Sequence, residues 1–339
     1  MTYRIVIQPS GHEFEIEKEE TILDGALRNG FAFSYGCRAG SCGSCRGKVI
    51  QGEYRYEDDE KPMALSEHDE KTGMCVFCQA YPDSDMELEV KEISAAKDIV
   101  VKTLPCRVTK LEKLAPDVMR MYLKLPMIER MQFLAGQYLD VLLKDGRRRS
   151  FSIANGPHDD ELMELHVRKI EGGEFTTHVF EGMKEKDILR IEGPLGNFFL
   201  RTESERPIIF VAGGTGFAPI KAIIEHAIAE KLKRPVYFYW GARDKASLYM
   251  SDLAESWGQE LADYRFTPVL ANAAAEDQWQ GETGMVHEAV LNDFDDLSLF
   301  DVYASGPPGM IDAIADTFSE KGMDSDHFYS DAFNFADDG

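Results

Sequence analysis

Alternation of apolar and polar residues marks the start of the chain as a small mixed α/β unit. Residues 3–17 form two alternating runs around a Pro-Ser-Gly turn, which predicts a β-hairpin. Apolar residues at helical spacing in ETILDGALRN predict a short helix, and KVIQGEY and MELEV predict further strands. We expect these elements to form one domain over residues 1–95, followed by a linker at 96–102.

The middle of the chain has the pattern of an all-β domain. Short apolar runs such as VMRMYLKL, QYLDVLLKDG and LMELHVRKI are separated by Gly, Pro and charged turns. Strands that follow one another every 8–15 residues or so, as roughly here, are typical of an antiparallel barrel or sandwich. The pattern therefore predicts a β-barrel domain over residues 103–203.

The last part of the chain changes to alternating strands and helices. Apolar runs such as PIIFVAGG, RPVYFYWGA and FDVYASG alternate with helical stretches such as PIKAIIEHAIAEK. This alternation predicts a parallel sheet with helices on its faces, and ligands bind such sheets at the carboxyl ends of the strands. We expect an α/β domain over residues 204–339.

Composition narrows the function classes. The 339 residues include 37 Lys and Arg against 60 Asp and Glu, a formal charge of −23, which disfavours nucleic acid and anionic membranes as partners. The chain starts MTYRIVIQP, with neither a basic and apolar leader nor a long apolar run, so we expect no membrane span. These features favour a cytoplasmic protein.

Five of the six cysteines are crowded between positions 37 and 78. In a reducing compartment, such crowding favours metal ligation over disulfides. Cys37, Cys42 and Cys45 have the C-x4-C-x2-C spacing of plant-type 2Fe-2S proteins, whereas zinc sites and buried free thiols are weaker alternatives. The spacing alone leaves open whether Cys75 or Cys78 is the fourth ligand.

Residues 1–95 resemble plant-type ferredoxins, which implies a β-grasp fold with both helix and sheet. The segment CQAYPDSDMELEV resembles the closing strand of these proteins, whose first residue is the fourth ligand. The resemblance thus implies Cys78 as that ligand and leaves Cys75 and Cys106 as packing residues.

The all-β region carries a pattern suited to a flavin. Arg149-Ser150-Phe151-Ser152 offers a cation for a phosphate, an aromatic ring for the isoalloxazine and a hydroxyl for a ring nitrogen. A basic strand with a core phenylalanine is the alternative explanation. Further on, Gly172-Gly173 precede a helix start, and backbone N–H groups at such a start suit a pyrophosphate.

Three loops follow apolar strands in the α/β region and are expected at one edge of its sheet. They are a glycine turn, Gly213-Gly214-Thr215-Gly216, a Gly-Ala-Arg loop ending at Arg243, and a Ser-Gly-Pro loop at 305–307. A glycine turn between a strand and a helix lets the backbone approach a pyrophosphate closely.

Together these patterns resemble the ferredoxin–NADP reductase superfamily. The resemblance implies an FAD site, an NAD(P)H site and a closing aromatic residue, Phe333, over the flavin. In this family a cysteine usually precedes Gly-Pro-Pro, whereas this chain has Ser305 at that position. No basic residue follows the third strand, in LeuAlaAsnAlaAla, which favours NADH. The implied FAD residues are Arg149, Phe151, Ser152, His166, Val167, Arg168, Gly173, Phe175 and Thr176; the implied NADH residues are Gly213, Gly214, Thr215, Gly216, Arg243, Gly306 and Pro307; the implied catalytic residues are Ser152, Ser305 and Phe333.

The whole chain resembles the reductase components of bacterial aromatic-ring and alkane oxygenases, and also the CDP-6-deoxyglucoseen reductases. This resemblance implies that electrons pass from NADH through FAD and a 2Fe-2S cluster to a separate terminal oxygenase. A deoxysugar dehydrase as acceptor and a passive electron carrier are the alternatives. Residues 1–95 hold 10 basic against 19 acidic residues. A solvated surface explains this charge, and the functional alternative is an acidic face that guides docking onto a basic patch of the acceptor.

Overall fold

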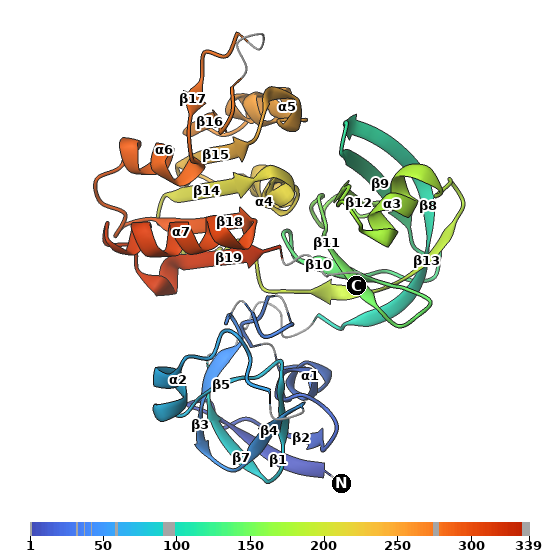
Figure 1. Cartoon of the computed structure of the whole chain (residues 1–339), viewed down its shortest axis with the longest axis vertical. Coiled ribbons are helices and arrows are strands. Elements are labelled where there is room, and N and C mark those ends of the chain that lie inside the picture. The colour runs from blue at the N-terminus through green and yellow to red at the C-terminus, as the bar shows by residue number, and fades with distance from the viewer. Residues whose placement is uncertain are drawn as a thin grey trace. The chain divides into compact units, whose positions relative to one another are not determined.

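The computed structural model of the chain describes residues 2–31, 33–36, 38–41, 43–57, 60–90, 99–273 and 278–333. The chain forms two compact units, residues 1–101 and 102–339, which we call the N-terminal and C-terminal units (Figure 1). The boundary between them falls inside the segment expected to be a linker. No helix within the described ranges is long and apolar enough to span a bilayer.

The N-terminal unit is built on a five-stranded sheet with the strand order β2-β1-β7-β3-β5. β1 (Thr2–Gln8) and β2 (Glu13–Glu17) form the expected antiparallel hairpin, and β1 also pairs in parallel with β7 (Met86–Glu89). The other elements are α1 (Ile22–Arg28), β3 (Arg46–Gln51), β4 (Tyr54–Tyr56), α2 (Glu67–Lys71), β5 (Met74–Val76) and β6 (Ala80–Pro82).

Helix α1 packs closely on β2 because it carries a glycine at the contact. The Thr21 hydroxyl begins the helix by accepting a hydrogen bond from the Asp24 N–H at 3.2 Å. A Cβ on Gly25 would lie 2.6 Å from Cγ1 of Ile16, so a larger residue would push α1 off the strand. Phe33 and Phe77 are fully buried in the same core. The expected α+β fold of this unit is confirmed.

The first part of the C-terminal unit is an antiparallel sheet with the order β11-β10-β13-β8-β9-β12, which we call the barrel. Its outer strands, β11 (Arg148–Ser152) and β12 (Met163–Arg168), are joined by a bridge between Ile153 and Leu165. The sheet thus curls until its two edges meet around a buried apolar core. The other elements are β8 (Lys102–Ala115), β9 (Val118–Lys124), β10 (Tyr138–Leu142), α3 (Glu174–Glu181) and β13 (Ile188–Leu195).

The second part is the expected parallel sheet, with the order β17-β16-β15-β14-β18-β19. Apolar residues of α4 and α5 pack on one face, and those of α6 and α7 pack on the other (Figure 1). The elements are β14 (Ile208–Gly213), α4 (Phe217–Ala229), β15 (Val236–Ala242), α5 (Ser251–Ser256), β16 (Tyr264–Leu270), β17 (Glu282–Thr283), α6 (Val286–Asp293), β18 (Asp301–Gly306), α7 (Pro308–Ser319) and β19 (Phe328–Ala332).

The last described residues form a strand that the sequence pattern does not predict. Residues 328–332 form β19, which pairs in parallel with β18 from Val302 to Gly306. Every residue of β18 is buried, so without β19 this strand would leave its backbone polar groups unpaired at a sheet edge. The added strand carries the last described residues back to the carboxyl edge of the sheet.

Gly216, at the carboxyl ends of the strands, has no room for a side chain, so its substitution should lower the stability of the protein. A Cβ on Gly216 would lie 1.9 Å from the Ser305 carbonyl oxygen, whereas a Cβ on Gly309 in α7 would meet nothing within 4 Å. We expect Gly216→Ala to lower the free energy of unfolding by about 2 kcal/mol or more, because two backbone segments must separate. Gly309→Ala should leave it unchanged or raise it slightly.

Urea unfolding of the full chain followed by tryptophan fluorescence measures this effect, since all three tryptophans lie in the parallel-sheet part, at 240, 257 and 279. Equal midpoints for the two variants would contradict the close approach of the Gly216 turn to β18.

Candidate functional site

The segment from Gly36 to Cys45 forms the loop where the cysteines are crowded. Gly40 and Gly43 have φ values of +73° and +69°, a conformation that residues with a Cβ rarely adopt. The Gly40 carbonyl accepts a hydrogen bond from the Ala64 N–H at 3.0 Å, which ties the loop to the segment before α2. Cys37 and Cys42 lie outside the described residues, whereas Cys45 is described and buried.

Two cysteines after the loop have different surroundings. The Phe77 N–H donates to the Cys45 carbonyl at 3.1 Å, so Cys45 and Cys78 lie near each other, and both are buried. The Tyr56 hydroxyl donates to Cys75 Sγ at 3.6 Å, and burial raises the pKa of the Cys75 thiol to about 12. Cys75 thus has a hydrogen-bond partner within the protein, which suits a packing residue.

Gln79 is a residue of this region that sequence reasoning missed. Its side-chain amide donates to the carbonyl oxygens of Arg38 and Cys78, both at 2.9 Å. It therefore links the cysteine loop to Cys78, which lies in the turn between β5 and β6 rather than on the closing strand that the resemblance implies. Nothing in the spacing of the motif indicates this role, because it depends on a contact between positions 38 and 79.

Strand β11 presents the residues expected to bind flavin. Ser152 pairs with Tyr138 of β10, and its hydroxyl, almost fully buried, lies 3.3 Å from Oδ2 of Asp331. The half-buried Phe151 ring lies 5.5 Å from that of Phe175 at the start of α3. Strand β11 thus contacts α3 through Phe151 and β19 through Ser152.

The turn before α3 has the expected form. Gly172 has a φ of +78°, Gly173 precedes the first helical residue, and the Thr176 hydroxyl accepts a hydrogen bond from the Ile170 N–H at 3.1 Å. The Thr176 side chain therefore stabilises the turn through a hydrogen bond with its backbone. The N–H groups of the first helical turn are the ones that can bind an anion.

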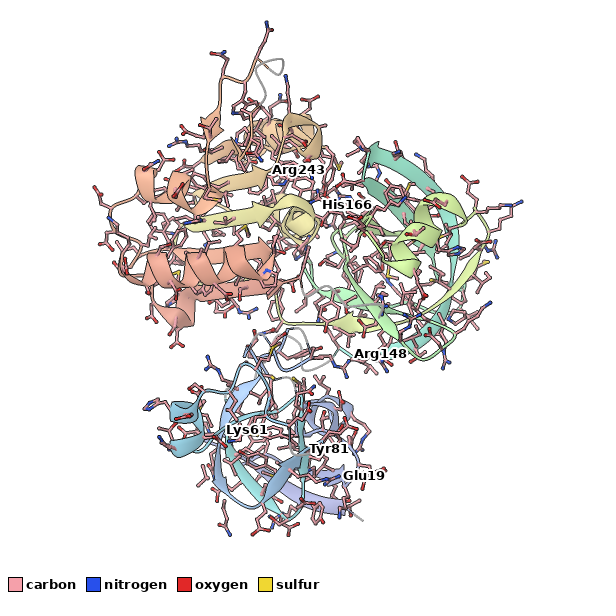
Figure 2. The ribbon with its side chains drawn as sticks, in the orientation of Figure 1. Glu19, Lys61, Tyr81, Arg148, His166 and Arg243 are labelled. Atoms are coloured by element: carbon pink, nitrogen blue, oxygen red, sulfur yellow. The ribbon has the colours of Figure 1, made fainter. Side chains whose placement is uncertain are left out.

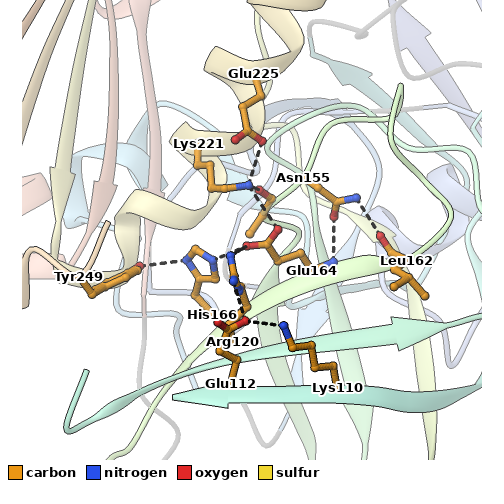
Figure 3. A network of polar contacts seen from close by, with 11 residues as sticks. Lys110, Glu112, Arg120, Asn155, Leu162, Glu164, His166, Lys221, Glu225 and Tyr249 are labelled. Carbon is orange, nitrogen blue, oxygen red and sulfur yellow. Dashed lines mark hydrogen bonds and ion pairs between the residues drawn. The ribbon is translucent and has the colours of Figure 1, made fainter. Parts of the chain in front are cut away.

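The residues expected on β12 point in different directions. His166 is fully buried, with Nδ1 at 3.0 Å from the Tyr249 hydroxyl and Nε2 at 2.8 Å from Glu164 (Figure 3). Any flavin contact by His166 would therefore come from its backbone. Val167 lies in the barrel core, whereas the Arg168 guanidinium faces the glycine turn: a Cβ on Gly214 would lie 2.6 Å from its Nη1.

The carboxyl edge of the parallel sheet brings two of the three expected loops together. Gly213 ends β14, Gly216 lies against the Ser305 carbonyl, and α4 begins at Phe217. Arg243 follows β15 on the outer surface, with 71% of its side chain exposed, and pairs with Asp244 at 3.1 Å (Figure 2). The glycine turn is thus the centre of this edge, and Arg243 lies at its rim.

The end of the chain brings a further acidic residue to this edge. The Phe333 N–H donates to the Gly306 carbonyl at 2.9 Å, which places Phe333 beside the Ser-Gly-Pro loop. In the same strand pair, Asp331 lies opposite Ser305 and also contacts Ser152 of the barrel. Sequence reasoning missed Asp331, since a lone acidic residue near a terminus carries no pattern.

Two buried polar atoms beside the glycine turn indicate that a polar ligand belongs here. The Ser305 hydroxyl and Nη2 of Arg168 have no hydrogen-bond partner within the described chain, although both atoms are buried. Buried polar groups are nearly always hydrogen-bonded, so a bound group is expected to supply the partners. A nucleotide with a pyrophosphate fits this donor set and the absence of a side chain on Gly214.

Comparisons with known proteins identify all three parts of the chain. Residues 5–83 match the family model of the 2Fe-2S iron-sulfur cluster binding domain. Residues 105–200 match the oxidoreductase FAD-binding domain, and residues 210–316 match the oxidoreductase NAD-binding domain. These matches assign 2Fe-2S, FAD and NAD as the cofactors.

Several relatives match the whole chain. A CDP-6-deoxy-L-threo-D-glycero-4-hexulose-3-dehydrase reductase of Yersinia pestis is 40% identical, covering 98% of this chain and 99% of the relative. The phenol hydroxylase P5 protein of Acinetobacter pittii is 35% identical, covering 100% of this chain and 96% of the relative. The crystal structure of the Amycolatopsis cytochrome P450 reductase GcoB superposes with a TM-score of 0.84 at 29% identity, over 98% of this chain and 99% of that one.

The matches span nearly the whole length of this chain and of each relative, and the fold agrees with that of GcoB. The matches confirm the resemblance that the motifs indicate, including the combination of an iron–sulfur domain with flavin and nicotinamide domains. The chain belongs to the family of iron–sulfur flavoprotein reductases, NADH-dependent oxidoreductases that supply electrons to a separate enzyme component.

Proposed function

We propose that this reductase takes a hydride from NADH onto FAD and passes single electrons through its 2Fe-2S cluster to a terminal oxygenase. NADH releases two electrons together, the flavin can release them separately, and the cluster accepts one at a time. The observation that best supports the first transfer is the contact between barrel and parallel sheet, where Ser152 of β11 lies 3.3 Å from Asp331 of β19.

The relatives differ in the acceptor they serve. The phenol hydroxylase P5 protein and the Comamonas terephthalate 1,2-dioxygenase reductase component 1, 32% identical, are named after oxygenases. The Yersinia pestis protein, at 40% identity, is named after a CDP-deoxysugar dehydrase. Because this relative is more similar in sequence than the two oxygenase reductases, a CDP-deoxysugar dehydrase stays as the alternative acceptor. Reduction of each purified acceptor by this reductase and NADH decides between the two.

We also propose the residues that hold the cofactors. The buried Cys45 and Cys78 support a ligand set that the loop spacing completes, and the unpartnered atoms of Arg168 and Ser305 support nucleotide binding at the glycine turn. The proposed groups are Cys37, Cys42, Cys45 and Cys78 for the cluster; Arg149, Phe151, Ser152, Arg168, Gly173, Phe175 and Thr176 for FAD; and Gly213, Gly214, Thr215, Gly216, Arg243, Gly306 and Pro307 for NADH.

Three residues are proposed to act at the reacting groups. Ser152 and Ser305 carry hydroxyls on the two facing parts of the C-terminal unit, and both are buried. Phe333, held at the Gly306 carbonyl, is proposed to cover the flavin until the nicotinamide displaces it. The domains that carry these roles are proposed as 1–95, 103–203 and 204–339.

NADH is the proposed donor rather than NADPH. Arg243 is the one cation among the residues proposed for NADH, and its Nε already pairs with Asp244 at 3.1 Å. Asp244 is itself held by the Ser247 hydroxyl at 2.7 Å, so its carboxylate stays beside Arg243. A 2′-phosphate at that position would meet a fixed negative charge.

Two cysteine variants test the proposed electron path. We expect Cys78→Ser to lose the cluster's visible absorbance and at least about 90% of NADH-driven cytochrome c reduction, because a thiolate ligand is lost. Reduction of ferricyanide should continue, since a small acceptor can take electrons from the flavin. Cys75→Ser should keep the cluster and both activities, because the Cys75 thiol already pairs with Tyr56.

The opposite behaviour of the two variants would overturn the ligand assignment. Loss of ferricyanide reduction in Cys78→Ser, with flavin still bound, would instead overturn the order of FAD before the cluster.

The acidic N-terminal unit generates a prediction on ionic strength. Cytochrome c, a basic acceptor, should be reduced about tenfold more slowly in high salt than in low salt, because steering by opposite charges is screened. Glu67→Lys in α2 should weaken this salt dependence, since 92% of the Glu67 side chain is exposed. Glu161→Lys in the barrel, at 81% exposure, is the matched control and should leave it unchanged. A rate independent of salt would assign the acidity to solubility alone.

A further inference from the structure

A buried lysine joins the parallel sheet to the barrel (Figure 3). Lys221 of α4 is only 4% exposed. Its ammonium donates to the Ala154 carbonyl at 3.0 Å and to Glu164 of β12 at 3.3 Å, both in the barrel. It also donates to Glu225, one turn further along α4, at 2.8 Å. One side chain thus links both parts of the C-terminal unit.

A second contact crosses the same interface. Glu164 accepts from His166, which in turn pairs with the Tyr249 hydroxyl of the parallel-sheet part at 3.0 Å. The His166 ring also lies parallel to that of Phe217, with centroids 6.1 Å apart. Phe217 stacks on Trp240 at 4.0 Å, so the barrel contact continues into the core under the parallel sheet.

The charged side chains of this interface pair with one another. Burial acts to raise the pKa of Glu164, but the hydrogen bond from His166 and the charge of Lys221 outweigh it, so the pKa lies below its usual value. Burial lowers the pKa of His166, which keeps its ring neutral. Lys221 faces the carboxyl groups of Glu164 and Glu225, and burial raises the pKa of Glu225. Arg120 lies 3.8 Å from Glu164.

Stability alone does not account for such a group of buried charges. Removing ions from water costs several kcal/mol each, and apolar residues of similar volume often stabilise a protein as well or better. Buried charge pairs can instead fix one position of two parts relative to each other, because their hydrogen bonds form only when both partners hold that position. Lys221, which donates to two carboxyl groups and one carbonyl, restrains the barrel and the parallel sheet in this way.

The elements that this interface joins are the ones proposed to hold the cofactors. Lys221 lies one helical turn after Phe217, which directly follows the glycine turn at 213–216. On the barrel side, Ala154 follows Ser152 by two residues, and Glu164 shares β12 with Arg168. A shift at Lys221 would therefore move the NADH-binding turn relative to the FAD-binding strands.

We propose that Lys221 is a positioning residue for hydride transfer, which, through Glu164 and the Ala154 carbonyl, sets the distance between nicotinamide and flavin. This inference rests on the proposed function. The hydride, a proton with two electrons, leaves NADH as NAD⁺ forms and reduces FAD, and Lys221 itself neither gains nor loses a proton. Transfer needs the reacting atoms about 3–3.5 Å apart, and a displacement of about 1 Å can slow it a hundredfold.

Anaerobic stopped-flow reduction of the bound FAD by NADH tests the proposal in the holoenzyme. Lys221→Met should reduce FAD at least about tenfold more slowly at saturating NADH, with the NADH dissociation constant changed by less than about threefold. Tyr249→Phe, which removes a single hydroxyl from the second contact, should slow it by a smaller factor. Lys124→Met is the control, because the Lys124 pair with Glu161 at 3.4 Å stays within the barrel.

Amide hydrogen exchange gives a readout that does not depend on turnover. Lys221→Met should speed exchange in residues 153–166 and in α4, but Lys124→Met should not. A merely stabilising role would lower the melting temperature and leave the rate of FAD reduction at saturating NADH unchanged.

A wild-type rate of FAD reduction in Lys221→Met would overturn the proposal. Should Lys221→Met fail to fold, Tyr249→Phe decides alone: a wild-type rate overturns the proposal, and a slower rate with unchanged NADH affinity supports it. A wild-type protein whose FAD is not reduced by NADH would overturn the proposed function together with this inference, so the two failures are distinguishable.

Discussion

Hydride transfer requires contact between two cofactors, and this constraint explains how the C-terminal unit is built. A nucleus moves with the electrons, so the donor and acceptor atoms must come within about 3–3.5 Å. Barrel and parallel sheet accordingly share one compact unit, joined by Lys221 and Glu164 and by the His166–Tyr249 pair. The cluster domain needs no such contact, because an electron moves without a nucleus, and it forms a separate compact unit.

The same constraint explains why backbone rather than side chains lines the edge of the parallel sheet. Gly216 lies so close to the Ser305 carbonyl that a Cβ would be 1.9 Å from it, and a Cβ on Gly214 would lie 2.6 Å from Nη1 of Arg168. The chain end adds β19 to this edge and brings Asp331 to Ser152. A ligand there meets fixed backbone and buried polar atoms, which suits a nucleotide that must be held in one orientation.

Local patterns predicted much of this protein, and long-range contacts account for what they missed. Alternating runs identified the barrel and the parallel sheet, and the spacing of Cys37, Cys42 and Cys45 identified the cluster domain. His166, expected at the flavin, has its ring buried in the contact with Tyr249, a partner 83 positions away. Asp331 lies 179 positions from Ser152. No sequence pattern singles out Lys221, because its burial depends on packing of α4 against the barrel.

The path from NADH through the flavin to the cluster is the central claim of this account. Anaerobic titration of the holoenzyme with NADH, followed by visible absorbance and by low-temperature EPR, tests it most directly. The account predicts that NADH alone bleaches the flavin and produces the EPR signal of a reduced 2Fe-2S cluster, and that flavin-depleted protein gives no such signal. Reduction of the cluster by NADH in flavin-depleted protein, or a cluster that stays oxidised beside a fully reduced flavin, would contradict it.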